Sequence, residues 1–156
     1  MEPIAADETC GCISVMGMGG RNIAGILQAG RDKLRGAVLV LSAHTDLELV
    51  RAAVMAADYR FTREEVCRMD DRFYVFFRAE PGREELTDRQ IRLGVRLFDH
   101  PSPVLYDYLR RRVQVLEAKE HGLLAAVSPD PGAAGRTAAD IAFCRAAMAC
   151  VSEQLA

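Results

Sequence analysis

The sequence predicts an α/β fold, in which a partly parallel sheet with covering helices is followed by an α-helical hairpin. A short apolar run at residues 13–16 passes through three closely spaced glycines into a helical pattern. A continuous apolar run at 37–41 precedes a second helical pattern, which is the order expected of parallel β-α-β units. Two further helical patterns flank a proline- and glycine-rich stretch at 128–135. We therefore expect two domains, residues 1–80 and 81–156.

The first domain is expected to hold four strands and two helices in the order β-α-β-α-β-β. Its second strand is a continuous apolar run, which is typical of a strand covered on both faces. The last two strands form a hairpin, with a turn near Asp70 and Asp71. The expected elements are strands at Ile13–Met16, Ala37–Leu41, Tyr59–Cys67 and Arg72–Ala79, and helices at Arg21–Arg35 (stopped by Gly36) and from Thr45 or Asp46 to Ala56.

The second domain is expected to be helical. Short helical patterns occupy Glu84–Phe98, and a long helix starts at Ser102 with Pro103 in its first turn. The 128–135 stretch cannot be helical throughout. The two long helices then form an antiparallel hairpin or short coiled coil, whose apolar stripe is a packing seam. In the final segment the apolar heptad positions are Ile141, Cys144, Met148, Val151 and Leu155.

Composition narrows the class of protein. The chain has 156 residues, a net charge of −2 and half of its residues apolar, without a run near the ~20 apolar residues of a membrane span. Its first eight residues are acidic and lead into no apolar signal region, which predicts a soluble cytoplasmic protein. Five cysteines and three histidines without zinc-like spacing favour reduced thiols and no metal site. The net charge requires any RNA contact to rest on a local basic patch.

The glycine-rich turn has two interpretations. Gly17, Gly19 and Gly20 permit positive φ and close backbone approach, and the amides of Arg21 and Asn22 open the following helix without intrahelical partners. Such a turn can hold a polar or anionic ligand. It can equally be a tight strand-to-helix connection without a ligand.

A family resemblance runs through most of the chain. The Val15–Gly20 segment resembles the fourth-strand region of the bacterial tRNA (adenine(22)-N1)-methyltransferase family. That resemblance implies an S-adenosylmethionine-dependent enzyme with a Rossmann-like methyltransferase sheet and a helical hairpin, of which this chain holds the C-terminal half. The main cofactor-binding half is then expected to come from a complementary N-terminal fragment. The unpaired apolar edge at Ile13–Met16 predicts pairing with that fragment, a homo-oligomer or aggregation. The matching residues continue through Ile23, Ile26, Leu27, Gly30, Lys33-Leu34, Val38–Leu41, Tyr74, Ala79-Glu80, Leu93-Gly94 and Pro103–Leu116.

The resemblance also implies where the site lies. The loop of Gly17, Met18, Gly19 and Gly20 borders the methyl-transfer site, and its three glycines contact part of the cofactor. Catalytic residues are not identified. Where the family tends to carry Gln-Pro-Asn, this chain has Ser42-Ala43-His44, so His44 at a strand's carboxyl end is a candidate for binding or catalysis. A solvated surface histidine is the alternative.

A basic patch is the candidate RNA contact, with tRNA as the partner that the resemblance implies. Phosphate contacts by such a patch supply affinity that does not depend on sequence. A solvated helix face with local ion pairs is the alternative. At the level of function, a tRNA adenine methyltransferase component competes with a non-catalytic RNA-binding or assembly module. The patch consists of Arg89, Arg92, Arg96, Arg110, Arg111 and Arg112.

Overall fold

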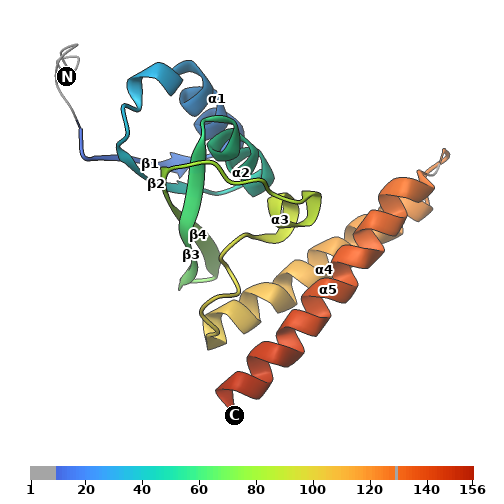
Figure 1. Cartoon of the computed structure of the whole chain (residues 1–156). Coiled ribbons are helices and arrows are strands. Elements are labelled where there is room, and N and C mark those ends of the chain that lie inside the picture. The colour runs from blue at the N-terminus through green and yellow to red at the C-terminus, as the bar shows by residue number, and fades with distance from the viewer. Residues whose placement is uncertain (1–9, 129) are drawn as a thin grey trace. The chain divides into compact units, whose positions relative to one another are not determined.

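The computed structural model describes residues 10–128 and 130–156, which form the elements drawn in Figure 1. The acidic segment at residues 1–8 lies outside the described residues. The elements, in chain order, are β1 (Cys12–Met18), α1 (Gly20–Ala29), the 3-10 helix η1 (Arg31–Lys33), β2 (Val38–Ala43), α2 (Leu47–Ala56), β3 (Tyr59–Met69), β4 (Arg72–Pro81), α3 (Asp88–Leu93), α4 (Pro103–Leu124) and α5 (Pro131–Leu155).

The four strands form one sheet in the order β1-β2-β4-β3. β1 pairs with β2 in parallel, with Cys12 opposite Val38 and Val15 opposite Leu41, whereas β4 runs antiparallel to β2. The helix between β1 and β2 is the crossover that a parallel pair requires. The predicted α/β fold with a parallel pair and a closing hairpin is therefore confirmed.

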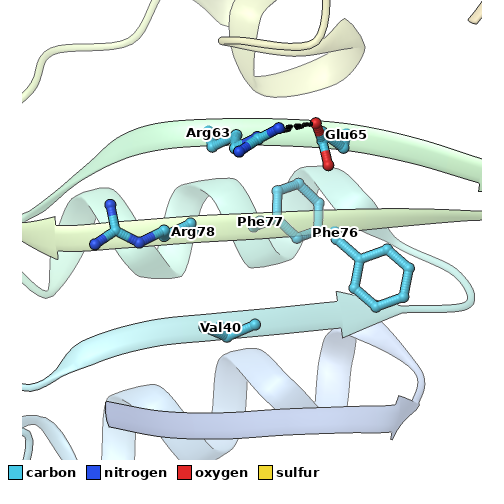
Figure 2. Close-up of a pocket in the computed structure, with 6 residues that line it drawn as sticks. All are labelled: Val40, Arg63, Glu65, Phe76, Phe77 and Arg78. Carbon is cyan, nitrogen blue, oxygen red and sulfur yellow. Dashed lines mark hydrogen bonds and ion pairs between the residues drawn. The ribbon is translucent and has the colours of Figure 1, made fainter. Parts of the chain in front are cut away.

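One face of the sheet is covered and the other is partly open. On β2, Leu39 and Leu41 are buried, but Val38 and Val40, which point to the opposite face, are only half-buried. Figure 2 shows α1 and α2 behind the strands. On the open face Val40 lines a shallow pocket together with Arg63, Glu65, Phe76, Phe77 and Arg78 (Figure 2). The prediction that β2 is covered on both faces is thus correct for one face only.

The first helix is shorter than the sequence predicts. α1 ends at Ala29, where the Gly30 amide donates to the Ile26 carbonyl, and a 3-10 turn follows. Glycine in a helix interior costs about 1 kcal/mol relative to alanine, so the chain leaves the helix at Gly30. The expected stop at Gly36 is a later turn, where Arg35 and Gly36 both have positive φ. The predicted helix end at Arg35 is wrong for this reason.

The described residues gather into two compact units that interleave along the chain. The first unit consists of residues up to Glu65 and Tyr74–Arg96, and the second of Val66–Phe73 and Leu97–Ala156. Residues 81–96 thus belong with the sheet, and the tip of the β3–β4 hairpin belongs with the long helices. Whether the predicted domains, 1–80 and 81–156, fold independently stays a prediction.

The second unit is built on a helical hairpin. α4 starts as predicted, because the Ser102 hydroxyl accepts from the Leu105 amide and Pro103 occupies the first turn. α5 starts earlier than predicted: Asp130 caps it through the Ala133 amide, with Pro131 as its first residue. The last part of the predicted 128–135 loop is therefore helical. α4 and α5 then run side by side in opposite directions (Figure 1), and the buried members of the predicted stripe are Ile141, Cys144 and Val151.

Candidate functional site

The candidate site lies at the carboxyl ends of β1 and β2. Because these strands are parallel, Met18 comes to lie opposite Ala43, and the His44 amide donates to the Met18 carbonyl at 3.2 Å. The Gly20 amide donates to the Thr45 carbonyl at 2.9 Å. Two segments that the sequence marks separately, the glycine-rich turn and the end of β2, therefore meet at the edge where α/β sheets bind ligands.

Close packing against the backbone requires a glycine at position 20. It is buried, and a Cβ atom on it would lie 2.2 Å from the Asp46 carbonyl oxygen. No side chain fits there, so only glycine allows α1 to approach the β2–α2 connection this closely. The amide of Asn22 is also occupied, since it donates to the Gly19 carbonyl at 3.0 Å. The expectation that the Asn22 amide is open to the loop is wrong, because the first turn of α1 closes on Gly19.

The other two glycines have different roles. Gly17 lies inside β1, with φ of +77° where the pairing with β2 shifts between Val15 and Met18. This conformation is the reason for a glycine at that position. Gly19 is the residue that caps α1, and a Cβ atom on it would lie 3.2 Å from the Thr45 hydroxyl oxygen. The predicted four-residue loop is thus a single capping residue, which leaves Gly19 beside the edge.

His44 and Tyr74 place two aromatic rings near this edge. The ring centroids lie 5.6 Å apart in an edge-to-face arrangement, a favourable geometry for aromatic pairs. His44 is exposed and Tyr74, from β4, is half-buried. The sequence predicts His44 as a site residue. It does not predict Tyr74, because Tyr74 comes to lie beside His44 only through the pairing of β4 with β2. An aromatic surface next to a glycine suits a flat, π-bonded ligand such as a nucleobase.

A buried ion pair supports the sheet unit behind this edge. The Arg51 Nε atom of α2 donates to Glu64 Oε1 of β3 at 2.7 Å, and Arg51 Nη1 donates to the Ile91 carbonyl at 3.1 Å. The other Glu64 carboxylate oxygen accepts from the amides of Val95 and Arg96. Because each contact joins a different part of the chain, the pair fixes residues 91–96 against α2 and β3.

The six predicted arginines separate into two groups. Arg89, Arg92 and Arg96 lie in the sheet unit, whereas the other three lie in the helical unit. Arg96 is held by Glu84 at 2.8 Å and by the Phe61 carbonyl at 3.2 Å, so it serves packing of the sheet unit. Arg92 pairs with Asp88, one turn earlier on α3. RNA binding by this group stays a prediction.

Three consecutive arginines on a helix point in three directions, about 100° apart. Arg110 pairs with Asp107 at 3.0 Å, and Arg111 donates to the Gln114 amide oxygen at 3.3 Å. Arg112 faces the other helix, α5. Burial raises the pKa of the Cys144 thiol there, and the charge of Arg112 lowers it by a smaller amount. Arg110 and Arg111 therefore share a surface that Arg112 does not.

Two classes of site have no support in the described part of the chain. Among residues 10–128 and 130–156, no three histidine, cysteine or acidic side chains gather as a metal ion requires. Over the same ranges, none of the helices combines the length and the apolar character needed to cross a membrane.

The sheet order, with one parallel and one antiparallel neighbour of β2, defines a mixed α/β protein with a Rossmann-like arrangement. A Streptococcus agalactiae protein of the NADB-Rossmann superfamily has this fold: it is 22% identical, covering 88% of this chain and 60% of its own, with a TM-score of 0.73. At the level of sequence, the family model of the tRNA (adenine(22)-N(1))-methyltransferases matches residues 1–127. The chain belongs to this family, which confirms the resemblance and the Rossmann-like sheet with its helical hairpin.

Two further solved structures share the fold. The B. subtilis m1A22 tRNA methyltransferase is 21% identical, over 88% of this chain and 63% of its own, with a TM-score of 0.74. A Streptococcus pneumoniae protein solved in complex with S-adenosyl-L-methionine is 22% identical, over 88% of this chain and 60% of its own, with a TM-score of 0.73. The chain thus spans about three fifths of the length of these relatives. No curated protein matches its sequence.

Proposed function

We propose that residues 1–156 carry the substrate-facing part of an S-adenosylmethionine-dependent methyltransferase that acts on an adenine of tRNA. The observation that carries the proposal is the family match over residues 1–127, which includes the whole edge formed by Gly19, His44 and Tyr74. The solved relatives support the choice of cofactor and RNA, because one is a tRNA methyltransferase and another binds S-adenosyl-L-methionine.

The role of these residues is to position the base. N1 of neutral adenine carries a lone pair, so its methylation requires no base to remove a proton first. Rigid placement of the nucleophile then supplies much of the rate. In this proposal the adenine ring lies against the Gly19 backbone, where the missing side chain permits close approach, and beside the rings of His44 and Tyr74. His44 acts as a binding group rather than a general base.

The described residues do not by themselves form a cofactor cradle. The amides of Gly20 and Asn22 are used inside the fold, and Gly20 is closed off by the Asp46 carbonyl. We therefore propose that the main cofactor contacts come from a complementary segment, in a longer form of the chain or in a second polypeptide. Residues 1–156 alone are expected neither to bind S-adenosylmethionine appreciably nor to methylate tRNA.

The test is complementation. The chain is assayed with labelled S-adenosylmethionine and unmodified tRNA, alone and with the part of the B. subtilis enzyme that it does not match. We expect methyl transfer only in the mixture, at an adenine N1, where the added methyl blocks base pairing and stops reverse transcription. Calorimetry of the chain alone checks the cofactor directly. Saturable binding there contradicts the division of the site, and transfer to another atom contradicts the proposed reaction.

A glycine variant tests whether Gly19, at the carboxyl ends of β1 and β2, belongs to the methyl-transfer site. In the active mixture, Gly19→Val is expected to abolish turnover, because its side chain fills the space beside the base. Gly25→Ala, at an open position on the same helix, is the control and is expected to keep full activity. If the Gly19→Val variant keeps its turnover, Gly19 does not belong to the methyl-transfer site.

The alternative is a non-catalytic RNA-binding or assembly module. The observation that favours it is that Gly17 and Gly20 are both explained by the backbone, without any ligand. The same assays separate the two functions. A chain that binds tRNA but supports no methyl transfer in any mixture is the binding module.

Three further features belong to the proposal. We propose a cytoplasmic protein, because its substrate would be tRNA. We propose that α4 and α5 pack as a short coiled coil, in line with the heptad positions of the final helix. We propose that the free edge of β1 pairs with the complementary segment or with a second copy of the chain.

A further inference from the structure

A small concavity in the helical unit is lined by charged side chains that belong neither to the core nor to the candidate site at the carboxyl ends of β1 and β2. It lies between the tip of the β3–β4 hairpin and α4, and has a volume of about 200 Å³. Arg68 and Phe73 line it from the hairpin, and Arg110, Arg111 and Gln114 line it from α4. Sites for drug-sized ligands start near 300 Å³, so this one suits a single small group.

Positive charge exceeds negative charge in the concavity. Three guanidinium groups face two carboxylates, those of Asp71 and Asp107. The guanidinium nitrogens of Arg68 lie 3.5 Å from a carboxylate oxygen of Asp71 and 3.9 Å from one of Asp107, which is longer than a direct hydrogen bond. A guanidinium nitrogen of Arg110 also pairs with Asp107, at 3.0 Å. Arg111 instead donates to the neutral Gln114 amide. The concavity therefore has a net charge of +1. Because the ion pairs of Arg68 are long, its guanidinium N–H groups remain available to donate to a ligand.

The Arg68 side chain is held in place for binding. Its guanidinium carbon lies 6.0 Å from the centre of the Phe73 ring, and its Nε atom donates to the Asp70 carbonyl at 3.0 Å. The Phe73 ring in turn meets the Tyr108 ring edge-to-face at 5.8 Å. An arginine fixed by ring and backbone contacts loses little conformational freedom when an anion binds.

We propose that this concavity binds one phosphate group of an RNA backbone, with Arg68 and Arg111 as its main contacts. Guanidinium forks match phosphate oxygens geometrically, and the small volume fits a phosphate rather than a base or a whole cofactor. The inference rests on the proposed function for the identity of the RNA, which is tRNA. It differs from the predicted patch of six arginines because it adds Arg68 from the hairpin and leaves out Arg112.

Binding of unmodified tRNA by the full chain, followed by fluorescence anisotropy over a salt series, tests the proposal. We expect the double variant Arg68→Gln, Arg111→Gln to bind about 10-fold more weakly at low salt. The slope of log K against log salt should fall by about 0.7 to 0.9, because that is the contribution of one phosphate contact. Arg145→Gln on α5 is the matched control, since Arg145 is exposed and pairs with Glu117 outside the concavity. An unchanged slope in the double variant, or an equal loss in the control, overturns the proposal.

Two competitors identify the ligand chemistry. Inorganic phosphate at millimolar concentration is expected to weaken tRNA binding in the parent chain but not in the double variant. A polyglutamate peptide is expected to displace tRNA equally poorly from the parent chain and from the double variant. If polyglutamate, but not phosphate, displaces tRNA from the parent chain and not from the double variant, the concavity binds acidic proteins and the RNA site is overturned. The double variant Arg68→Lys, Arg111→Lys keeps the charge and is expected to restore the salt slope. Absence of methyl transfer in the complementation mixture, with arginine-dependent tRNA binding intact, overturns the proposed function and leaves this inference standing.

Discussion

Arg51 and Glu64 form an ion pair that is closed off from solvent, with Arg51 Nε 2.7 Å from Glu64 Oε1 and neither side chain more than 1% exposed. The Arg51 guanidinium also lies 5.2 Å from the centre of the Phe77 ring. Desolvating two charges is expensive, and only close geometry with further hydrogen bonds offsets the cost. Here Glu64 receives three donors, from Arg51 and the amides of Val95 and Arg96.

Breaking this pair is expected to destabilise the sheet unit strongly. Glu64→Gln leaves the Arg51 charge buried without a counter-charge, which costs about 3–5 kcal/mol of unfolding free energy. Glu65→Gln is the control on the same strand, because Glu65 is half-exposed and its pair with Arg63 is worth less than about 1 kcal/mol. Urea unfolding of both variants checks the difference. A Glu64→Gln variant as stable as Glu65→Gln contradicts the assignment.

The sequence contained a signal for this pair that is easy to overlook. Leu47, Val50 and Val54 follow helical spacing, and Arg51 falls on the same side of α2. A charge on an apolar face calls for a buried partner. The partner could not be named, because simple alternation from Tyr59 and Phe61 would bury Arg63 instead of Glu64.

Strands were more predictable than the ends of helices. The apolar run at Ile13–Met16 lies inside β1, and the run at Ala37–Leu41 lies inside β2 except for Ala37, because short continuous apolar runs are typical of buried strands. The end of α1 was misplaced because Gly30 competes with Gly36 as a stop. Only the pairing of strands could show that the glycine-rich turn meets His44 and Tyr74, and only the hairpin could bring Arg68 to Arg111.

Gly20 and Gly25 provide a matched pair on one helix. Gly20→Ala is expected to cost about 1–3 kcal/mol or more, because the new methyl group overlaps the Asp46 carbonyl oxygen. Gly25 has nothing within 4 Å of its Cβ position, so Gly25→Ala should stabilise the protein by up to about 1 kcal/mol through helix propensity. Thermal unfolding of the two variants measures both signs. Equal stabilisation by both substitutions contradicts the packing role of Gly20.

Cys144 is expected to make stability fall at high pH. Burial raises the pKa of its thiol from 9.0 to about 11, Arg112 opposes the rise, and Asp140 adds to it. Since the folded state then holds its proton more tightly than the unfolded state, the contribution is complete below pH 9 and is lost as pH rises from 9 to about 11. The loss amounts to about 3 kcal/mol at most.

Unfolding measured between pH 8 and 11 checks this effect. The Cys144→Ala variant should lose this part of the pH dependence, whereas Cys150→Ser, at an exposed position on the same helix, should keep it. Thiol labelling of the folded chain gives a second readout, in which Cys144 reacts far more slowly than the exposed cysteines. Equal pH profiles for Cys144→Ala and the parent chain exclude the buried thiol as the cause.

The free edge of β1 is expected to drive association of the 156-residue chain. Among the described residues β1 pairs on one side only, with β2, and it exposes Met16. An unprotected apolar edge strand is a template for pairing with another chain. Ser14→Lys places a charge at an exposed position of this edge and should shift the chain towards monomer, while Ser152→Lys on α5 adds the same charge away from the sheet and should not. Size-exclusion chromatography with light scattering over a range of protein concentrations measures the shift. If the parent chain is a monomer at every concentration, residues outside the described edge protect β1 and the pairing argument is wrong.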